Sequence, residues 1–281
     1  MITPSTPDLT ASALPPVIGV VASQLFNPYQ QKVLDEVTRQ LNAHGVITVL
    51  LNAEADTALT ALLRQASPLA LRGLLLLPGN RVTDACDLPV LDIKAEPALQ
   101  ADALRAGEVT AELLIAQGHQ TFGFMQSQPG ESAQKQGYST TLQAAGKALN
   151  VELTAEGDDR DGAYQVMMHY LKKTRAAERI QALFCESDLL AFGAMQAIRD
   201  FGQGAHLAVA GFGDSEEARS STWHLTSWSP DISQIVGNAI DGWLGQQAQN
   251  SIGQGQLKRR HSHFGKIVPG EMSACGCAFR H

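Results

Sequence analysis

An apolar run ends abruptly in polar and turn residues in the stretch Val17-Ile18-Gly19-Val20-Val21-Ala22-Ser23-Gln24-Leu25-Phe26-Asn27-Pro28-Tyr29. The same change recurs where Ala182-Leu183-Phe184-Cys185 meets Glu186-Ser187-Asp188, and where Leu207-Ala208-Val209-Ala210-Gly211-Phe212 meets Gly213-Asp214-Ser215. Short continuous apolar runs are typical of buried parallel strands. Loops beyond the carboxyl ends of such strands form the ligand crevice of open α/β sheets. The sequence therefore predicts a small-molecule crevice, and no catalytic group stands out in it.

Strand-like runs alternate with amphipathic helix patterns along most of the chain, which predicts a parallel α/β architecture. The predicted strands cover residues 17–21, 46–51, 73–77, 89–93, 121–125, 151–154, 182–185 and 207–212. Two successive sets of such βα units predict two similar lobes. The later sequence predicts strands at 223–228 and 264–268 and a helix at 232–244. We expect these late segments to connect the two lobes.

The helix predictions rest on apolar residues that recur near the 3.6-residue period. The clearest apolar faces hold Val33, Leu34, Val37 and Leu41, then Tyr138, Leu142, Ala145 and Leu149, then Ala163, Val166, Met167, Tyr170 and Leu171, and finally Leu189, Phe192, Met195 and Ile198. Asp188 directly precedes the last of these patterns, where it is expected to be the helix N-cap.

Length and composition exclude several classes of protein. The chain has 281 residues, enough for two lobes, and 44% hydrophobic against 17% charged residues is an ordinary globular balance. A formal net charge of −7 argues against sequence-independent binding to DNA or to anionic membranes, because both need clustered Lys and Arg. No apolar run approaches the roughly 18 residues of a membrane span. The four cysteines show no disulfide framework for a chain of this size.

The first 16 residues differ from the rest of the chain. They are rich in proline, threonine and serine, which predicts a flexible tail or the stub of a linker. They lack the basic start and the long apolar stretch of a secretory signal. Together with the cysteine usage, this favours a cytoplasmic location.

Six short motifs follow one another along the chain. They are Ile18-Gly19-Val20-Val21 with Asn27-Pro28-Tyr29, Gly118-His119, Gly137-Tyr138 with Leu142, Ser187-Asp188-Leu189-Leu190-Ala191-Phe192-Gly193-Ala194, Ala208-Val209-Ala210-Gly211-Phe212-Gly213-Asp214, and Leu225-Thr226-Ser227. No single motif is specific. In this order, the set resembles the effector domain of the LacI/GalR family of bacterial repressors, from about residue 17 to about residue 275.

The resemblance implies a fold of two Rossmann-like lobes with parallel sheets, joined by three crossovers as in type I periplasmic-binding-protein-like domains, with an effector between them. The crossovers are expected near residues 117–121, 227–231 and 249–256. The first lobe would comprise residues 17–118 and 230–250. The second would comprise residues 119–229 and 251–281.

The resemblance also implies partners. The family carries a helix-turn-helix of about 60 residues ahead of this domain, and that head reads an operator. Only 16 residues precede the first predicted strand here, so operator DNA would be a partner only through a head that this chain lacks. Either the chain is shortened or the natural protein has no head. We expect a homodimer that binds a small-molecule effector, with no cofactor, no membrane contact and no enzymatic activity. A solute-binding protein for transport or chemotaxis is the alternative.

The predicted ligand contacts begin at the strand ends of the first lobe. Tyr29 offers an aromatic face that would stack on a sugar ring, or it packs in the core. Asn27 can cap the following helix or donate a hydrogen bond. Asn52 and Asn80 follow the second and third strands, as ligand contacts or as turn residues.

Three acidic or basic residues near the fourth strand complete this set. Asp92 ends the strand, and Lys94 follows it as a partner for an anionic effector or as a solvated lysine. Asp102 lies where the resemblance expects an acidic residue at the start of a helix. Its simplest role is to cap that helix and to favour the helix dipole.

Three positions depart from the family pattern. Gln134, with Lys135 beside it, stands where the family commonly has Arg. Ser187 replaces the Asn before Asp188, and Gly213 replaces the first Asp of an Asp pair. Gln134, Ser187, Asp188 and Gly213 are the predicted ligand contacts of the second lobe. In sugar-binding members the three departing positions commonly bond hydroxyl groups, so the departures remove a cation and a carboxylate from the cleft. We therefore expect a changed effector, such as a sugar acid, a phosphorylated metabolite or a non-sugar metabolite.

Other motifs weigh less. Ser132-Ala133-Gln134-Lys135 spells the S-x-x-K of some acylating serine enzymes, but the companion motifs are absent. His261, His263, Cys275, Cys277 and His281 are conceivable metal ligands, yet strand alternation and a terminal position explain them, and no metal site is predicted. The basic run at 257–261 is interpreted as a solvated face.

Overall fold

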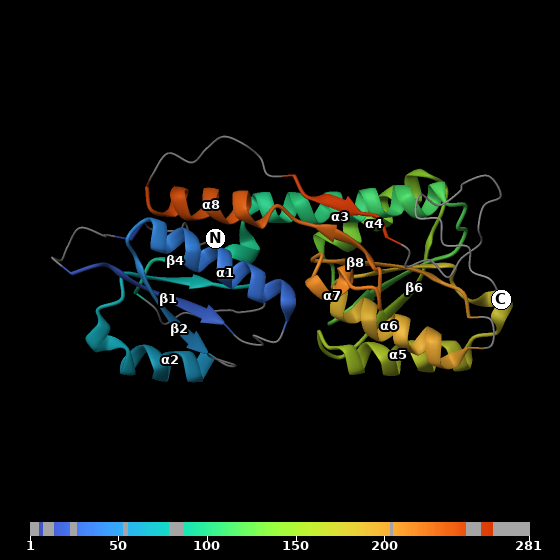
Figure 1. Cartoon of the computed structure of the whole chain (residues 1–281), viewed down its shortest axis with the longest axis horizontal. Helices are drawn as coiled ribbons and strands as arrows, with labels where there is room; N and C mark the ends of the chain where they lie inside the picture. Colours follow the sequence, from blue (N-terminus) through green and yellow to red (C-terminus); the bar gives the residue numbers. More distant parts are fainter. Residues whose placement is uncertain are drawn as a thin grey trace.

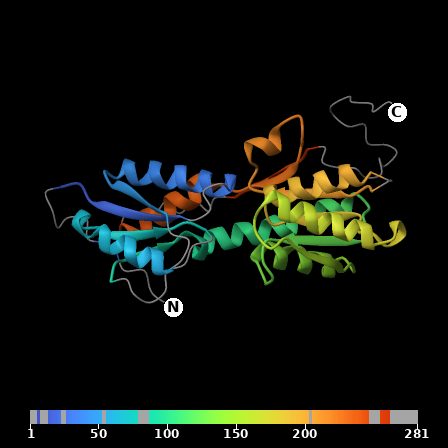
Figure 2. The same cartoon turned by 90° about the horizontal axis from the view of Figure 1, so that it is seen from below.

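The computed structural model describes residues 6–7, 14–22, 27–52, 56–78, 87–202, 205–245 and 254–260. Two β-sheets, each covered by helices, form two lobes that lie side by side (Figure 1; Figure 2). The predicted class, an α/β fold with two Rossmann-like lobes, is confirmed. Among the helices of these residues, none is both long and apolar enough to cross a membrane.

The first sheet has the strand order β2-β1-β3-β4, and all its pairings are parallel. Its strands are β1 (Val17–Ala22), β2 (Ile47–Asn52), β3 (Gly73–Leu76) and β4 (Val90–Asp92). The helical segments around it are α1 (Pro28–Ala43), α2 (Asp56–Gln65), α8 (Ile232–Trp243) and the 3-10 turns η1 (Ser67–Leu69) and η2 (Ile93–Ala95). Val20 of β1, Val37 of α1 and Ile240 of α8 share one buried core, so α8 packs on this sheet although it comes late in the chain.

The second sheet has the strand order β10-β9-β8-β7-β5-β6. Its strands are β5 (Phe122–Gln126), β6 (Leu149–Thr154), β7 (Ala182–Cys185), β8 (Ala208–Phe212), β9 (Thr226–Ser229) and β10 (Gln256–Lys258). Its helical segments are α3 (Pro97–Ala116), α4 (Ala133–Ala144), α5 (Arg160–Lys173), α6 (Asp188–Phe201), α7 (Glu216–Arg219) and η3 (Ala176–Glu178). The sheet is parallel except at β10, which pairs antiparallel with β9 and forms an edge that the sequence did not predict.

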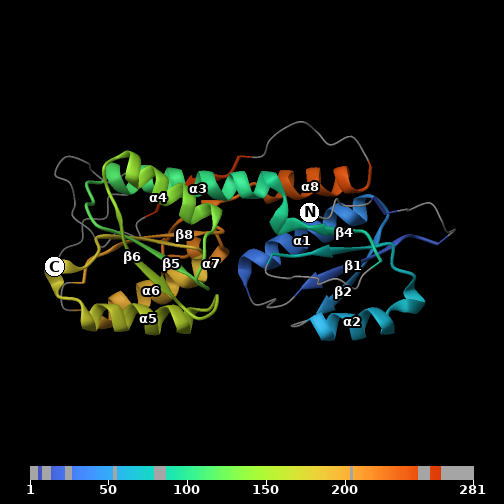
Figure 3. The same cartoon turned by 180° about the vertical axis from the view of Figure 1, so that it is seen from behind.

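The chain passes between the sheets three times, as predicted. The first passage lies inside α3, because Leu99 packs in the core of the first sheet whereas Ala106 and Leu114 pack in the core of the second. This differs from the expected position at residues 117–121, and it groups most of α3 with the second sheet (Figure 3). The second passage joins β9 to α8 near the predicted residues. The third runs from α8 to β10, mostly outside the described residues.

Two local predictions are corrected by the structure. Leu149 does not continue the helical face of Tyr138, because α4 ends at Ala144 and Leu149 is the first residue of β6. Gly146, with a φ of 69°, turns the chain between them. The strand expected at 223–228 forms instead as β9 at Thr226–Ser229, and the one expected at 264–268 lies outside the described residues.

Candidate functional site

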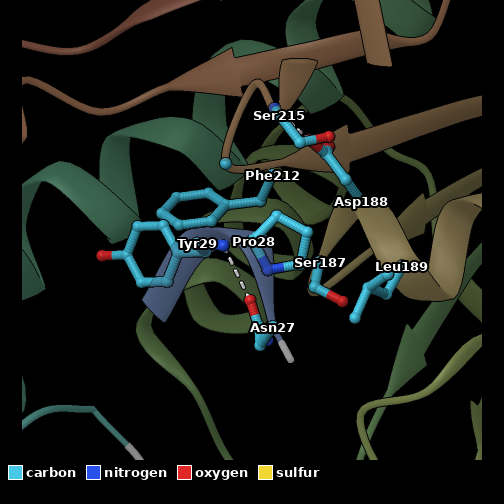
Figure 4. A pocket seen from close by; sticks show the side chains of 9 residues that line it. Asn27, Pro28, Tyr29, Ser187, Asp188, Leu189, Phe212 and Ser215 are labelled. Atoms are coloured by element: carbon cyan, nitrogen blue, oxygen red, sulfur yellow. Dashed lines mark hydrogen bonds between the residues drawn. The ribbon is translucent and has the colours of Figure 1, made fainter. Parts of the chain in front are cut away.

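A cleft with about 190 Å³ of space, part of it open solvent, lies where the two lobes face each other. One wall is the start of α1 in the first lobe, and the other is formed by the start of α6 and the end of β8 in the second (Figure 4). The lining residues are Asn27, Pro28, Tyr29, Ser187, Asp188, Leu189, Phe212, Gly213 and Ser215. The cleft thus lies beyond the carboxyl ends of the strands, where open α/β sheets bind ligands.

The first-lobe wall is held by a helix cap. Asn27 Oδ1 accepts hydrogen bonds from the backbone N–H groups of Tyr29 at 2.8 Å and Gln30 at 3.4 Å, and Pro28 follows as the first helical residue. The Tyr29 ring meets the edge of Phe212 at 5.5 Å between centroids, so it packs across the lobes and also lines the cleft. Burial, and then the charge of Asp102, raises the pKa of Tyr29 above its ordinary value of 10, so its hydroxyl stays protonated.

The second-lobe wall shows which residue caps α6. The Ser187 hydroxyl accepts a hydrogen bond from the Leu190 N–H at 3.3 Å, so Ser187 is the N-cap and Asp188 is the first helical residue, contrary to the prediction. Asp188 instead accepts bonds from the Ser215 N–H and the Ser227 hydroxyl, both at 2.6 Å. Burial raises the pKa of Asp188, against the effect of these hydrogen bonds. Asp188 therefore fixes the turn after β8 and also borders the cleft.

The departure at Gly213 has a backbone cause. Its φ of 120° favours glycine, and a Cβ added there would lie 3.5 Å from the Tyr29 Cβ. The Gly213 carbonyl accepts a hydrogen bond from Lys32 Nζ of α1 at 2.8 Å, and Lys32 also bonds the Asp214 carbonyl. Lys32 thus supplies a cation at the cleft that the sequence patterns did not single out. Burial lowers its pKa, an effect that the charge of Asp214 opposes.

The site also has a carboxylate that the sequence analysis did not predict, that of Asp158. Asp158 lies in the loop between β6 and α5, where it accepts a hydrogen bond from Asn27 Nδ2 of the first lobe and one from the Ser187 hydroxyl at 2.5 Å. Burial raises the pKa of Asp158 to about 6. Its partners stand 131 and 29 residues away in sequence, so no local spacing signals the contact.

The remaining predicted contacts lie apart from the lining residues. Gln134 is buried at the start of α4, where its Nε2 donates to the Glu186 carbonyl at 3.3 Å. Asp92 accepts from the Lys94 N–H at 2.9 Å and so caps η2, while Lys94 is exposed. Asn52 is exposed at the end of β2. Asn80 lies outside the described residues, and contact of these residues with a ligand stays a prediction.

Asp102 does not cap α3, as was expected, because that helix begins at Pro97. The Asp102 carboxylate is buried and accepts hydrogen bonds from Trp228 Nε1 at 2.8 Å and from the Gly255 N–H at 2.7 Å. A Cβ at Gly255 would lie 2.4 Å from Trp228 Nε1, so only glycine permits this approach. One carboxylate thus ties α3 to the second and third passages between the lobes.

Two other motifs have structural roles. In the S-x-x-K segment, the Ser132 hydroxyl caps α4, while Lys135 Nζ pairs with Glu152 at 2.7 Å and with Glu131 at 3.0 Å. In the basic run, Arg260 is not a solvated residue, because it pairs with the buried Asp214 at 2.7 Å. The described residues contain no group of three or more candidate metal ligands, and the His and Cys residues near the C-terminus lie outside them.

Known proteins are similar to this chain in sequence and in fold. A family profile described as periplasmic binding proteins and sugar binding domain of LacI family matches residues 15–222. The ribose operon repressor of Haemophilus influenzae is 28% identical over 271 residues, which cover 89% of this chain and 77% of the repressor. The ribose import binding protein RbsB of Bacillus subtilis is 24% identical over 224 residues, or 73% of this chain and 72% of that protein.

Solved structures agree on the fold. A LacI family transcriptional regulator from Enterococcus faecium with bound ribose superposes with a TM-score of 0.69 at 19% identity, covering 88% of this chain and 98% of that one. The lac repressor dimer bound to operator and an anti-inducer gives a TM-score of 0.70 at 17% identity, covering 90% and 96%. Since the family profile matches most of its length, the chain belongs to the family of periplasmic binding proteins and sugar-binding domains of LacI-type regulators.

Proposed function

We propose that this chain is the effector-sensing domain of a LacI-type transcriptional regulator, and that a small metabolite binds in the cleft between its lobes. The cleft carries the proposal, because its walls come from both lobes and are already joined across it by Lys32 and by Tyr29. A ligand held between such walls favours one angle of the lobes over another. This is a population shift, and it needs only a difference in affinity between the two forms.

The described side chains of the cleft favour an uncharged, hydroxyl-rich effector. Tyr29 and Phe212 present aromatic surface suited to the apolar face of a sugar ring. The Asn27 amide and the Ser187 hydroxyl also line the cleft, where each donates to Asp158, and a ligand hydroxyl would take the place of Asp158 as their partner. The one lysine beside the cleft in this part of the chain, Lys32, already bonds two carbonyls, and Asp158 would repel an anion. We therefore expect a neutral sugar to bind more tightly than the sugar acid or the phosphorylated metabolite that the departures from the family pattern suggest.

A thermal-shift screen tests ligand binding, with D-ribose and D-glucose beside D-ribose 5-phosphate and D-gluconate. A ligand that binds only the native state raises its stability by about 2.7 kcal/mol at 100 times the dissociation constant. We expect a neutral sugar to raise the melting temperature and a titration calorimeter to give one site per chain. Tight binding of the phosphate or the acid alone would contradict the ranking. Failure of every metabolite in a wider screen would contradict sensing itself.

The regulator would act as a homodimer in the cytoplasm, with DNA reached through a separate head. Its lobe angle would set the spacing of two heads on a pseudo-palindromic operator. Sedimentation equilibrium is expected to give twice the mass of the chain. The reading frame upstream of Met1 is expected to encode a helix-turn-helix, and an export signal in its place would instead support the transport alternative, which RbsB represents among the relatives.

We also propose that the domain performs no reaction on its ligand. Lys135 is engaged by two glutamates and Ser132 by a helix end, so the S-x-x-K segment supplies no free base and nucleophile. Incubation of the ligand with the protein, followed by mass spectrometry, should return the ligand unchanged. A stoichiometric excess of any product would contradict this.

A further inference from the structure

Asp158 joins two helix starts that belong to different lobes. One carboxylate oxygen accepts from the amide of Asn27, which caps α1, and the other accepts from the hydroxyl of Ser187, which caps α6. Both partners line the cleft. Asp158 and Ser187 belong to the second lobe, so any opening that moves α1 away from α6 must break the bond between Asn27 and Asp158.

The surroundings of Asp158 disfavour its charge. Burial is the largest influence on its titration, and the charged groups that face it are Glu186, from the loop before α6, and Asp159, the N-cap of α5. Both are acidic. Asn27 and Ser187 are neutral donors that favour the ionised form, and within the described residues no cation forms an ion pair with Asp158.

We propose that Asp158 is a positioning residue that latches the two lobes around the cleft, and that closure of the lobes strengthens as the pH falls. Opening returns the carboxyl to water, where its pKa is near 3.8, whereas in the closed form burial raises the pKa to about 6. The closed form therefore binds the proton more tightly. The gain in closure is complete below pH 3.8 and is lost as the pH rises through about 6.

The size of the effect follows from the two pKa values. Between pH 7.5 and pH 5 the closing equilibrium should rise about tenfold, toward a limit on the order of a hundredfold at lower pH. Small-angle X-ray scattering of the ligand-free chain measures it as a fall in the radius of gyration over this pH range. An unchanged radius in the wild type would overturn the proposal.

Asp158→Asn isolates the charge, because an amide still accepts from Asn27 and can donate to Ser187. This variant should keep the compact radius at every pH. The matched control Asp161→Asn removes an equal charge from an exposed position in the first turn of α5 and should keep the wild-type pH response. A pH response that survives Asp158→Asn, or disappears in Asp161→Asn, would overturn the latch.

Asn27→Ser gives a second variant that does not depend on how Asp158→Asn folds. It keeps a hydroxyl oxygen that can cap α1 but removes the amide that donates to Asp158 across the lobes, so it should enlarge the radius at pH 7.5, while closure still strengthens as the pH falls. An unchanged radius would contradict the latch. The consequence for effector affinity rests on the proposed function, but lobe closure is measured here without an effector. A negative scattering result would therefore contradict the latch but not effector sensing. A negative metabolite screen would contradict effector sensing but not the latch.

Discussion

Gly107→Ala should destabilise the chain because α3 and α4 cross at backbone contact. A Cβ at Gly107 would lie 2.1 Å from the Gln134 carbonyl oxygen and 2.6 Å from the Tyr138 nitrogen. A Cβ at Gly137 would likewise lie 2.1 Å from the Leu104 carbonyl oxygen, so the approach is tight from both helices. Ordinary contact begins at 3.4 Å, which requires α4 to shift by about 1.3 Å with no side chain to rotate away. Gln134, which bonds the loop before Ser187, moves with it.

Overpacking of this kind costs about 1–3 kcal/mol, and the better helix propensity of alanine returns up to about 1 kcal/mol. We expect Gly107→Ala to lower the free energy of unfolding by about 1–2 kcal/mol in urea denaturation followed by circular dichroism. Gly242→Ala is the matched control, since a Cβ there meets nothing within 4 Å in α8. It should raise stability by up to about 1 kcal/mol. Equal stability of Gly107→Ala and wild type would refute the reasoning.

Three further predictions concern single contacts. Trp228→Phe keeps most of the ring but removes the donor to Asp102, and urea unfolding should show a loss of about 1–3 kcal/mol; no loss would mean that this bond does not hold the passages. Burial raises the pKa of Asp214, but hydrogen bonds from Arg219 and Arg260 outweigh it and leave that pKa below its ordinary value, so Asp214→Asn should cost about 1–3 kcal/mol at pH 7. The cost should begin to fall below pH 3.8, the ordinary pKa, and should vanish once the pH lies below the lowered pKa of Asp214, and a pH-independent difference would contradict the ion pairing. Tyr29→Ala should weaken calorimetric binding of the screened sugar by about tenfold, whereas unchanged affinity would remove Tyr29 from the site.

The central strands were predictable because each is a short apolar run in a parallel sheet that is buried on both faces. Four of the predicted core strands have every residue buried, among them β7 and β8. The edge strand β10 was missed, since Gln256 and Lys258 are exposed and leave no apolar signal. Gly146 marks the end of α4 in the sequence. The apolar spacing of Tyr138 and Leu142 continues past that glycine to Leu149, which is why the predicted helix was too long.

The cleft residues that sequence alone could name are those that directly follow a strand, and they include Ser187 and Gly213 of the second lobe. Asn27 and Tyr29 follow a strand directly, so their place at the crevice follows from the fold class. Asp158 and Lys32 each bond a residue of the other lobe. These contacts depend on how the two lobes pack together, which no local sequence pattern predicts. Asp102 was misread for the same reason, because both of its partners come from more than 120 residues downstream.

The most direct test of the cleft as the effector site is a crystal structure of the chain with the metabolite that gives the largest thermal shift. We predict one molecule between the lobes, with its ring against Tyr29 and Phe212 and its hydroxyls bonded to Asn27 or Ser187. A metabolite bound on the outer surface of either lobe, with the space between α1 and α6 empty, would contradict the assignment.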